Sequence, residues 1–326
     1  FNAQAVAANL ERIFDTSDPG LASQRSRFML GSFNGYDIVD DYTIRFRLSQ
    51  PYSPLLDSLS QVYLGMGSPA AFEEHGRDVY QFHQVGTGPY TLEEFVPGDR
   101  IVLRINPDYT WGPAFMNRQA DVPQQITYRF YTDPATRRPV LEAQEVDVIG
   151  ELVPTDARSL VGSGDFRILP TPVAGQPLQF LMNTTQYPTD NTAFRQALIY
   201  GTSREEIVDT VFQGFSPVAW GPLTASTLYY SRDMEGTYAH NAQEARDLLA
   251  SIGFEDADGN GFLDTPDGDL EVVIVHASWG FLPETVQLIQ DQWREIGIRA
   301  VLEPVAGFPA LIARANEGDY NLIAFN

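Results

Sequence analysis

A strand, a helix and a second strand follow one another near the end of the chain. Residues 270–276 form an apolar run typical of a buried strand, and residues 298–302 form another. Between them, residues 283–296 carry apolar side chains at helical spacing. Because a crossover helix joins strands that run in the same direction, this order predicts a parallel pair. The chain should therefore adopt an α/β fold, with mixed sheets flanked by helices.

The loop after the first of these strands is the first candidate for ligand contact. In open α/β sheets, ligands bind beyond the carboxyl ends of the strands. Such sites are mostly apolar, with a few directional polar groups. The candidate residues of this loop are His276, Ser278, Trp279 and Phe281. Trp293, in contrast, lies in a helical apolar stripe, which predicts a core position.

Aromatic residues in other loops extend the list of candidates. Trp220 and the pair Tyr229 and Tyr230 could stack on a sugar ring, a peptide side chain or a cation, and anchoring of their loops is the alternative. Asn183 could exchange hydrogen bonds with a ligand backbone, or it could form a turn.

An acidic loop at residues 256–267 has the spacing of an EF-hand calcium loop, with Gly261 at the sixth position. The ligand positions fall on Asp256, Asp258, Asn260, Phe262 through its carbonyl, Asp264 and Asp267. The loop departs from the pattern because an aspartate replaces the bidentate glutamate at the last position and no paired helix follows. It predicts a structural Ca²⁺ site, or an Asx-rich turn that needs no ion.

Composition excludes several classes of function. All 21 basic residues are arginines, and 43 carboxylates bring the formal net charge to -22, so nucleic acid and anionic lipid are repelled. The absence of cysteine excludes disulfides, thiolate metal sites and cysteine nucleophiles. No GxSxG, Walker or HExxH motif is present, and the abundance of carboxylates gives no specific support to a glycoside hydrolase. We expect a binding protein without catalysis that requires no cofactor.

The length of 326 residues predicts more than one hydrophobic core, and changes in the pattern of expected strands and helices along the chain suggest three segments. The segments are 1–84, 85–177 and 178–326. Helix start signals are strong in the third. Ser203 and Glu206 predict a capping box for a helix that runs through Phe212 and ends at Gly214. Asn241 and Glu244 predict a second capping box, at the start of a later helix.

Several short motifs occur in a characteristic order. They are Val-Gly-Thr-Gly-Pro-Tyr-Thr-Leu at 85–92, Asn-Pro-Asp-Tyr at 106–109, Phe-Leu-Met-Asn at 180–183, the segments 194–198 and 203–208, Ala-Arg-Asp-Leu-Leu at 245–249 and Ile-Gly-Ile at 296–298. In this succession the chain resembles the family 5 extracellular solute-binding proteins, which include dipeptide, oligopeptide and nickel binders. The resemblance covers the chain from end to end.

The resemblance implies a periplasmic-binding-protein-like clamp of two lobes plus an accessory domain. Residues 1–84 would belong to the accessory domain, 85–177 to the first lobe and 178–326 to the second, truncated, lobe. Segments at both ends would be missing, including an export signal or lipid anchor and an aspartate that pairs with a peptide's amino terminus. The protein would be periplasmic or on the cell surface.

The implied function is the ligand-capturing component of an ABC importer, which holds an oligopeptide or a solute of similar size and delivers it to the permease subunits. We expect a monomer. An oligosaccharide remains an alternative ligand, and a sensory receptor built on the same clamp remains an alternative function.

Overall fold

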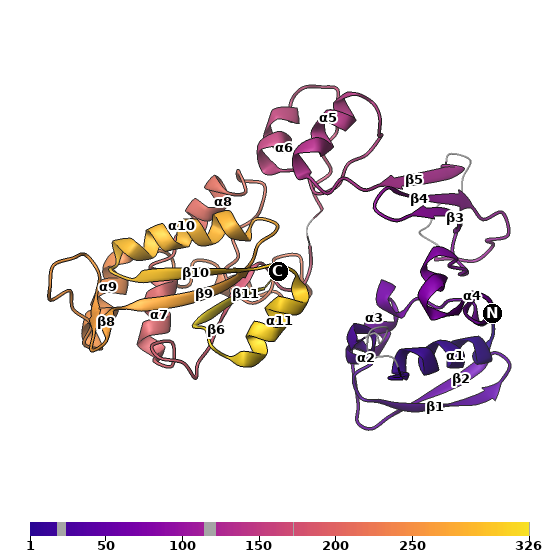
Figure 1. Ribbon diagram of the computed structural model, residues 1–326, viewed down its shortest axis with the longest axis horizontal. Coiled ribbons are helices and arrows are strands. Elements are labelled where there is room, and N and C mark those ends of the chain that lie inside the picture. Colours follow the sequence, from indigo (N-terminus) through magenta and orange to yellow (C-terminus); the bar gives the residue numbers. More distant parts are fainter. Residues whose placement is uncertain (18–23, 114–121, 172, 326) are drawn as a thin grey trace. The chain divides into compact units, whose positions relative to one another are not determined.

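The computed structural model describes residues 1–17, 24–113, 122–171 and 173–325. The chain divides into two compact units, Phe1–Asp133 and Pro134–Asn326 (Figure 1). The divisions predicted near residues 84 and 177 fall within these units and stay predictions. Among the described residues, none of the helices combines the length and the apolar character needed to cross a membrane.

The first unit begins with an amphipathic helix on a hairpin. Helix α1 (Ala3–Phe14) starts at Asn2, whose side chain accepts a hydrogen bond from the Ala5 amide at 3.0 Å. It packs against the antiparallel strands β1 (Phe33–Asp40) and β2 (Thr43–Leu48). Its Leu10 and Ile13 are buried in a core that other helices of the unit complete.

The remaining elements of the first unit are short helices followed by a second sheet. The helices are α2 (Gln24–Met29), α3 (Leu55–Leu59) and α4 (Pro69–Val79), with 3₁₀ turns at Val62–Leu64 and Tyr80–Phe82. Strands β3 (Tyr90–Val96), β4 (Arg100–Ile105) and β5 (Gln125–Arg129) form an antiparallel sheet in that order.

The second unit is built on a four-stranded sheet with the order β10-β9-β11-β6. Its strands are β6 (Gln179–Met182), β9 (Glu271–Ala277), β10 (Arg299–Val305) and β11 (Leu322–Phe325), and a small hairpin joins β7 (Asp264–Thr265) to β8 (Gly268–Asp269). Its helices are α5 (Arg137–Glu142), α6 (Pro154–Leu160), α7 (Thr192–Tyr200), α8 (Arg204–Thr210), α9 (Ala242–Ser251), α10 (Leu282–Glu295) and α11 (Phe308–Glu317). A 3₁₀ turn lies at Arg232–Met234.

The predicted crossover is confirmed. Strands β9 and β10 pair in parallel from Glu271↔Arg299 to Ala277↔Val305, and α10 connects them. Strand β11 continues the parallel pairing on the other side of β9, whereas β6 joins β11 antiparallel. Three neighbouring strands therefore point their carboxyl ends to one edge of the sheet (Figure 1).

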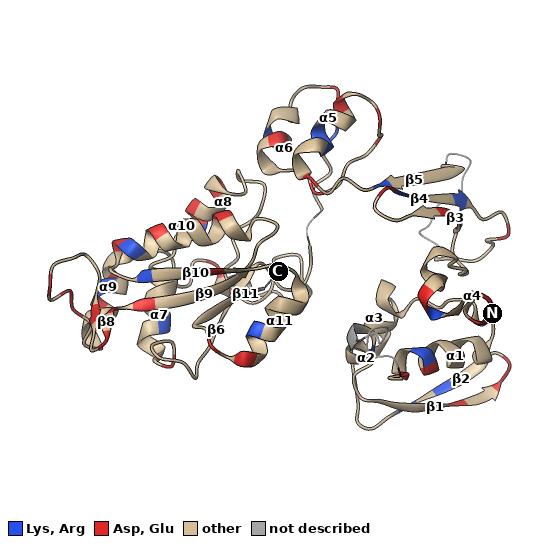
Figure 2. Ribbon diagram, in the orientation of Figure 1, with Lys and Arg blue, Asp and Glu red and all other residues tan. Residues whose placement is uncertain are grey.

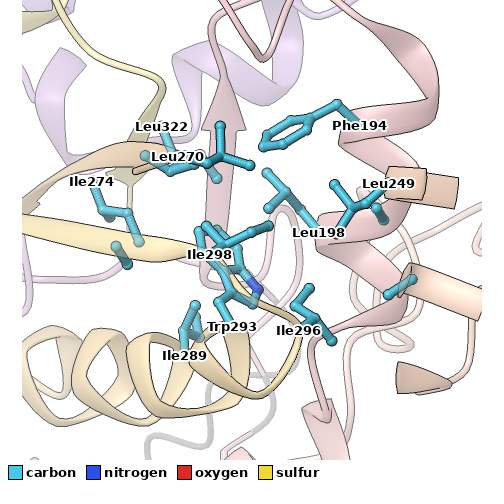
Figure 3. Packing of buried hydrophobic residues seen from close by; sticks show 14 of the residues in the cluster. Phe194, Leu198, Leu249, Leu270, Ile274, Ile289, Trp293, Ile296, Ile298 and Leu322 are labelled. Carbon is cyan, nitrogen blue, oxygen red and sulfur yellow. The ribbon is translucent and has the colours of Figure 1, made fainter. Parts of the chain in front are cut away.

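Alternate residues of β9 enter two different cores. Ile274 packs in the large core with residues of α7, α9 and α10, and Val275 packs with Leu311 of α11 in another core. Figure 3 shows the large core, in which Trp293 lies against apolar side chains of the sheet and the helices. Its indole nitrogen donates a hydrogen bond to Thr202 Oγ1 at 2.9 Å, which satisfies the buried polar group. The core position predicted for Trp293 is confirmed.

Only one of the two hydrogen bonds of the capping box predicted for α8 is present. Ser203 Oγ accepts the Glu206 amide at 3.3 Å, but the Ser203 amide donates to Gln292 Oε1 of α10 at 3.0 Å. Gln292 also donates to the Glu206 carboxylate at 2.8 Å, so it stands between the two groups of the box. The predicted extension of this helix to Phe212 is wrong, because α8 ends at Thr210.

We predict that replacing Ile274 by alanine lowers the free energy of unfolding of the second unit by about 2–5 kcal/mol, because the side chain is fully buried and its removal leaves a cavity. Urea denaturation followed by circular dichroism measures the change. Val148→Ala is the control, since Val148 is 83% exposed and its loss should change stability by less than about 0.5 kcal/mol. Equal losses in the two variants would contradict the assignment of the core.

Candidate ligand-binding site

The carboxyl edge of the four-stranded sheet is the candidate site. Strand β9 ends at Ala277 and β10 ends beside it at Val305. The Ser278 amide donates a hydrogen bond to the Val305 carbonyl at 3.1 Å, so the loop after β9 is tied to the end of β10. The amino end of β6 reaches the same edge, because Gln179 pairs with Phe325.

The loop after β9 presents one aromatic side chain to solvent and packs another. Ser278 is exposed and Trp279 is 41% exposed. Gly280 has φ +66°, a left-handed conformation that a side chain would strain, and it lets the chain turn into α10. Phe281 lies edge-on to Phe212 with 5.2 Å between ring centroids. The site can therefore offer an indole face together with a hydroxyl group.

Apolar residues form the floor beneath this loop. Ala277, Leu282 and Ala324 are buried together, with Leu178 and Phe180 packed against them. Leu178 and Phe180 were not among the predicted site residues. No local pattern near them indicates an antiparallel strand, and only the pairing with β11 brings them here.

His276 lies below the surface of the edge. The residue is only 4% exposed, and its Nδ1 is 3.0 Å from the Ala277 carbonyl oxygen. Its contact with a ligand stays a prediction, and its burial means that the ring would have to be uncovered to make that contact.

Asn183 lies at the other end of β6 and is engaged with the protein. Its Nδ2 donates to the Gly318 carbonyl at 2.9 Å, and its Oδ1 accepts the amide and hydroxyl of Thr185 at 3.0 and 2.8 Å. The Asn183 amide donates to the Asn321 carbonyl at 2.8 Å. The side chain holds the turn after β6, and the structure does not bring it together with Trp279.

Trp220 is held by an arginine from α8. The guanidinium carbon of Arg204 lies 4.4 Å from a Trp220 ring centroid. The same group donates to the Thr237 carbonyl at 3.0 Å, to the Ala219 carbonyl at 3.4 Å and to the Tyr238 carbonyl. Desolvation by burial lowers the pKa of Arg204, and the negative charge of Glu205 acts in the opposite direction. The Arg204 guanidinium and its three carbonyl partners, which we call the Arg204 fork, position the loop that carries Trp220.

The tyrosine pair shows two different environments. Tyr229 is 89% exposed and has φ +70°, a conformation uncommon for a residue with a side chain. The Tyr230 hydroxyl donates to Glu235 at 3.4 Å, and desolvation together with that carboxylate raises the pKa of Tyr230. Tyr229 is thus free to contact a solute, whereas Tyr230 is partly engaged.

The acidic loop brings three carboxylates together. Oxygen atoms of Asp256, Asp258 and Asp264 all lie within 4.8 Å of one another. Asp256 also accepts the amides of Gly259 and Gly261 at 2.8 and 3.0 Å, as in an Asx turn. The convergence suits a hard cation, and the amide contacts also stabilise the loop without one.

The other predicted metal residues anchor this loop. Asn260 donates to Asp258 and to Asp269 at 3.1 and 2.9 Å. The Phe262 ring lies 4.5 Å from the guanidinium carbon of Arg299, which is ion-paired with Asp269. Asp267 lies in the turn of the β7–β8 hairpin and is not among the three converging carboxylates.

Comparison with known families gives one match over the whole chain. The profile described as bacterial extracellular solute-binding proteins, family 5 Middle, matches residues 1–326. The glutathione-binding protein GsiB of Salmonella choleraesuis (strain SC-B67) is 30% identical over 302 residues, which are 92% of this chain and 54% of the relative. GsiB of Escherichia coli O157:H7 is 30% identical over 301 residues, with the same coverage. The chain thus spans about half the length of these relatives.

Solved structures share the fold. NikA from Brucella suis, in complex with Fe(III)-EDTA, has a TM-score of 0.83 at 24% identity, and the match covers 100% of this chain and 64% of that chain. The oligopeptide-binding protein AppA from Bacillus subtilis, with a nonapeptide, has a TM-score of 0.71 at 21% identity and the same coverage. DppA from Helicobacter pylori, with the peptide STSA, gives 0.73 at 22%, covering 100% and 61%. The predicted periplasmic-binding-protein-like fold class is confirmed.

We predict that Arg204→Gln lowers the free energy of unfolding by about 1–2 kcal/mol, because backbone carbonyls lose a charged donor. Tryptophan emission should also shift to longer wavelength as the loop around Trp220 loosens. Arg232→Gln, in an exposed position of the same region, should change neither property. Fluorescence-monitored denaturation of the three proteins tests this, and an unaltered emission in Arg204→Gln would contradict the role of the fork.

Proposed function

Because the chain belongs to family 5 of the bacterial extracellular solute-binding proteins, we propose that it captures a solute for an ABC importer. The observation that carries the proposal is the solvent-accessible Trp279, with Ser278, at the carboxyl edge of a parallel sheet. The protein binds its solute without transforming it and passes it to the membrane subunits of the permease. It acts as a monomer in the periplasm or on the cell surface.

The ligand that we propose is a short peptide. An exposed indole can cover an apolar side chain, and a serine hydroxyl with nearby backbone groups can pair with peptide amides. The names of relatives support this class, since they include a glutathione-binding protein and structures holding a nonapeptide and the peptide STSA. Other neighbours hold Fe(III)-EDTA and Ni(L-His), so chelates belong in any ligand screen.

The proposed contacts fall in two groups. Ser278, Trp279 and Phe281, with His276 beneath them, belong to the sheet edge. Trp220, Tyr229, Tyr230 and Asn183 would contribute from loops outside the edge. We also propose that residues 1–84 form part of the accessory domain, 85–177 part of the first lobe and 178–326 part of the second.

We predict that Trp279→Ala weakens peptide binding by about tenfold or more, because removal of a large aromatic contact from a binding site typically costs at least about 1.4 kcal/mol. Isothermal titration with glutathione and di- to pentapeptides measures the affinity. Stability should change little, since the side chain is 41% exposed.

Trp111→Ala is the matched control, because Trp111 is 60% exposed and belongs to the first unit, whereas the edge residues belong to the second. It should leave peptide affinity unchanged. Binding of an oligosaccharide or chelate in place of peptides would overturn the ligand class, and chemical conversion of the bound solute would overturn the binding function itself.

We further propose that the acidic loop holds a structural Ca²⁺ ion through Asp256, Asp258, Asn260, Phe262, Asp264 and Asp267. The convergence of Asp256, Asp258 and Asp264 and the EF-hand spacing support it. Its anchoring through Phe262 and Arg299 favours a role in stability.

Calcium at 100 times its dissociation constant should then add about 2.7 kcal/mol of stability relative to EDTA. Thermal unfolding with Ca²⁺ and with EDTA measures this gain. Asp258→Asn should abolish it, whereas Asp291→Asn, on an exposed position of α10, should retain it. A wild-type protein indifferent to Ca²⁺ would refute the metal site.

A further inference from the structure

The first unit contains a cavity of about 490 Å³ beside the carboxyl-terminal end of α1. Helix α4 and the segments before and after it complete the wall of the cavity. The residues on which the argument rests are Arg12, Met66, Phe72, Arg77, Asp78 and Tyr80. The cavity therefore combines cationic, apolar and hydroxyl groups.

One wall of the cavity is fixed by a buried side chain. Asn9 of α1 is fully buried, its Nδ2 donates to the Gly67 carbonyl at 2.8 Å, and its Oδ1 accepts the Gly67 amide at 3.0 Å. A Cβ atom built on Gly67 would lie 2.3 Å from the Tyr80 hydroxyl and 2.6 Å from Phe72 Cζ. The backbone and both rings are therefore in close contact, and the cavity is preformed.

The two arginines of the cavity differ in their partners. Arg77 donates to the Asp15 carboxylate at 3.0 Å and to the Arg12 carbonyl at 3.2 Å, so its charge is already paired. The guanidinium carbon of Arg12 lies 4.6 Å from the Phe72 ring centroid. Within the described residues, no carboxylate oxygen lies within 4.0 Å of an Arg12 guanidinium nitrogen.

The surroundings of Arg12 favour an added anion. Partial desolvation lowers the pKa of Arg12, Arg77 lowers it further by repulsion, and Tyr80 has the opposite effect. Arg12 nevertheless remains exposed, so a dissolved ligand can reach it. Figure 2 shows basic residues on both α1 and α4, in a chain whose formal net charge is -22.

We propose that this cavity binds a small organic monocarboxylate, with the carboxylate on Arg12 and the apolar body against Met66 and Phe72. A guanidinium fork matches the two oxygens of a carboxylate. A phosphate dianion fits less well, because Asp78 also lines the cavity and Arg77 is already paired. This proposal is independent of the solute bound at the sheet edge.

Hexanoate is the probe for this site, and the full 326-residue chain is the protein to test. We expect saturable binding by isothermal titration, with a shift of the Met66 methyl signal in ¹³C-methionine NMR that a Met66→Leu variant assigns. Arg12→Gln should weaken binding about tenfold or more, the loss expected for a charge-assisted hydrogen bond.

Two controls make the result specific. Arg45→Gln removes the same charge from an exposed position of β2 in the same unit and should leave the affinity unchanged. Hexanamide, which lacks the charge, should bind at least about tenfold more weakly than hexanoate. Undiminished binding to Arg12→Gln, no shift of Met66, no saturable hexanoate binding, or preference for inorganic phosphate would overturn the proposal. Loss of peptide binding at Trp279 would alter none of these readouts.

Discussion

The parallel pairing of β9 with β10 through α10 is the constraint on which the second unit depends. A strand buried on both faces carries mostly apolar side chains along its length. Polar side chains that could bind a ligand are therefore placed at its ends. Ile274 and Val275 illustrate this, since they enter different cores from neighbouring positions. The exposed Ser278 and Trp279 follow immediately after the strand. Packing therefore determines where a ligand can be recognised.

The same pairing gives the edge its rigidity. The loop after β9 is tied to the end of β10 by the Ser278 amide, and apolar residues of β6, β11 and α10 form its floor. A contact surface supported in this way loses little conformational freedom when a ligand binds. The side chain of Tyr229, by contrast, is 89% exposed, so it must be ordered when a ligand binds and contributes less for the same area.

Sequence patterns predicted structural features that depend on one segment of the chain, and they missed contacts between residues that are distant in the sequence. The crossover, the N-cap of α9 and the core position of Trp293 follow from periodicity and spacing within one segment. The contact between Arg204 and Trp220, and the insertion of Gln292 into the predicted capping box, depend on the tertiary fold. The early end of α8 and the position of Leu178 at the sheet edge have the same origin. Polar side chains have several acceptable partners, and only the fold selects one.

All lysine and arginine positions of this acidic chain are arginines, and each guanidinium can make several hydrogen bonds that orient its partners. Arg104 donates through two nitrogens to the two oxygens of Glu93, at 3.0 and 2.8 Å. Arg204 and Arg195 instead hold backbone carbonyls, a role that uses several donors of one planar group. A lysine would present a single point charge in these places. Against this background, Arg12 differs because it makes no such fork with the described protein, and it faces a cavity whose other groups suit an organic anion. The charge of Arg12 is available to bind a ligand, because Arg77 and Asn9 already make the hydrogen bonds that stabilise the cavity wall.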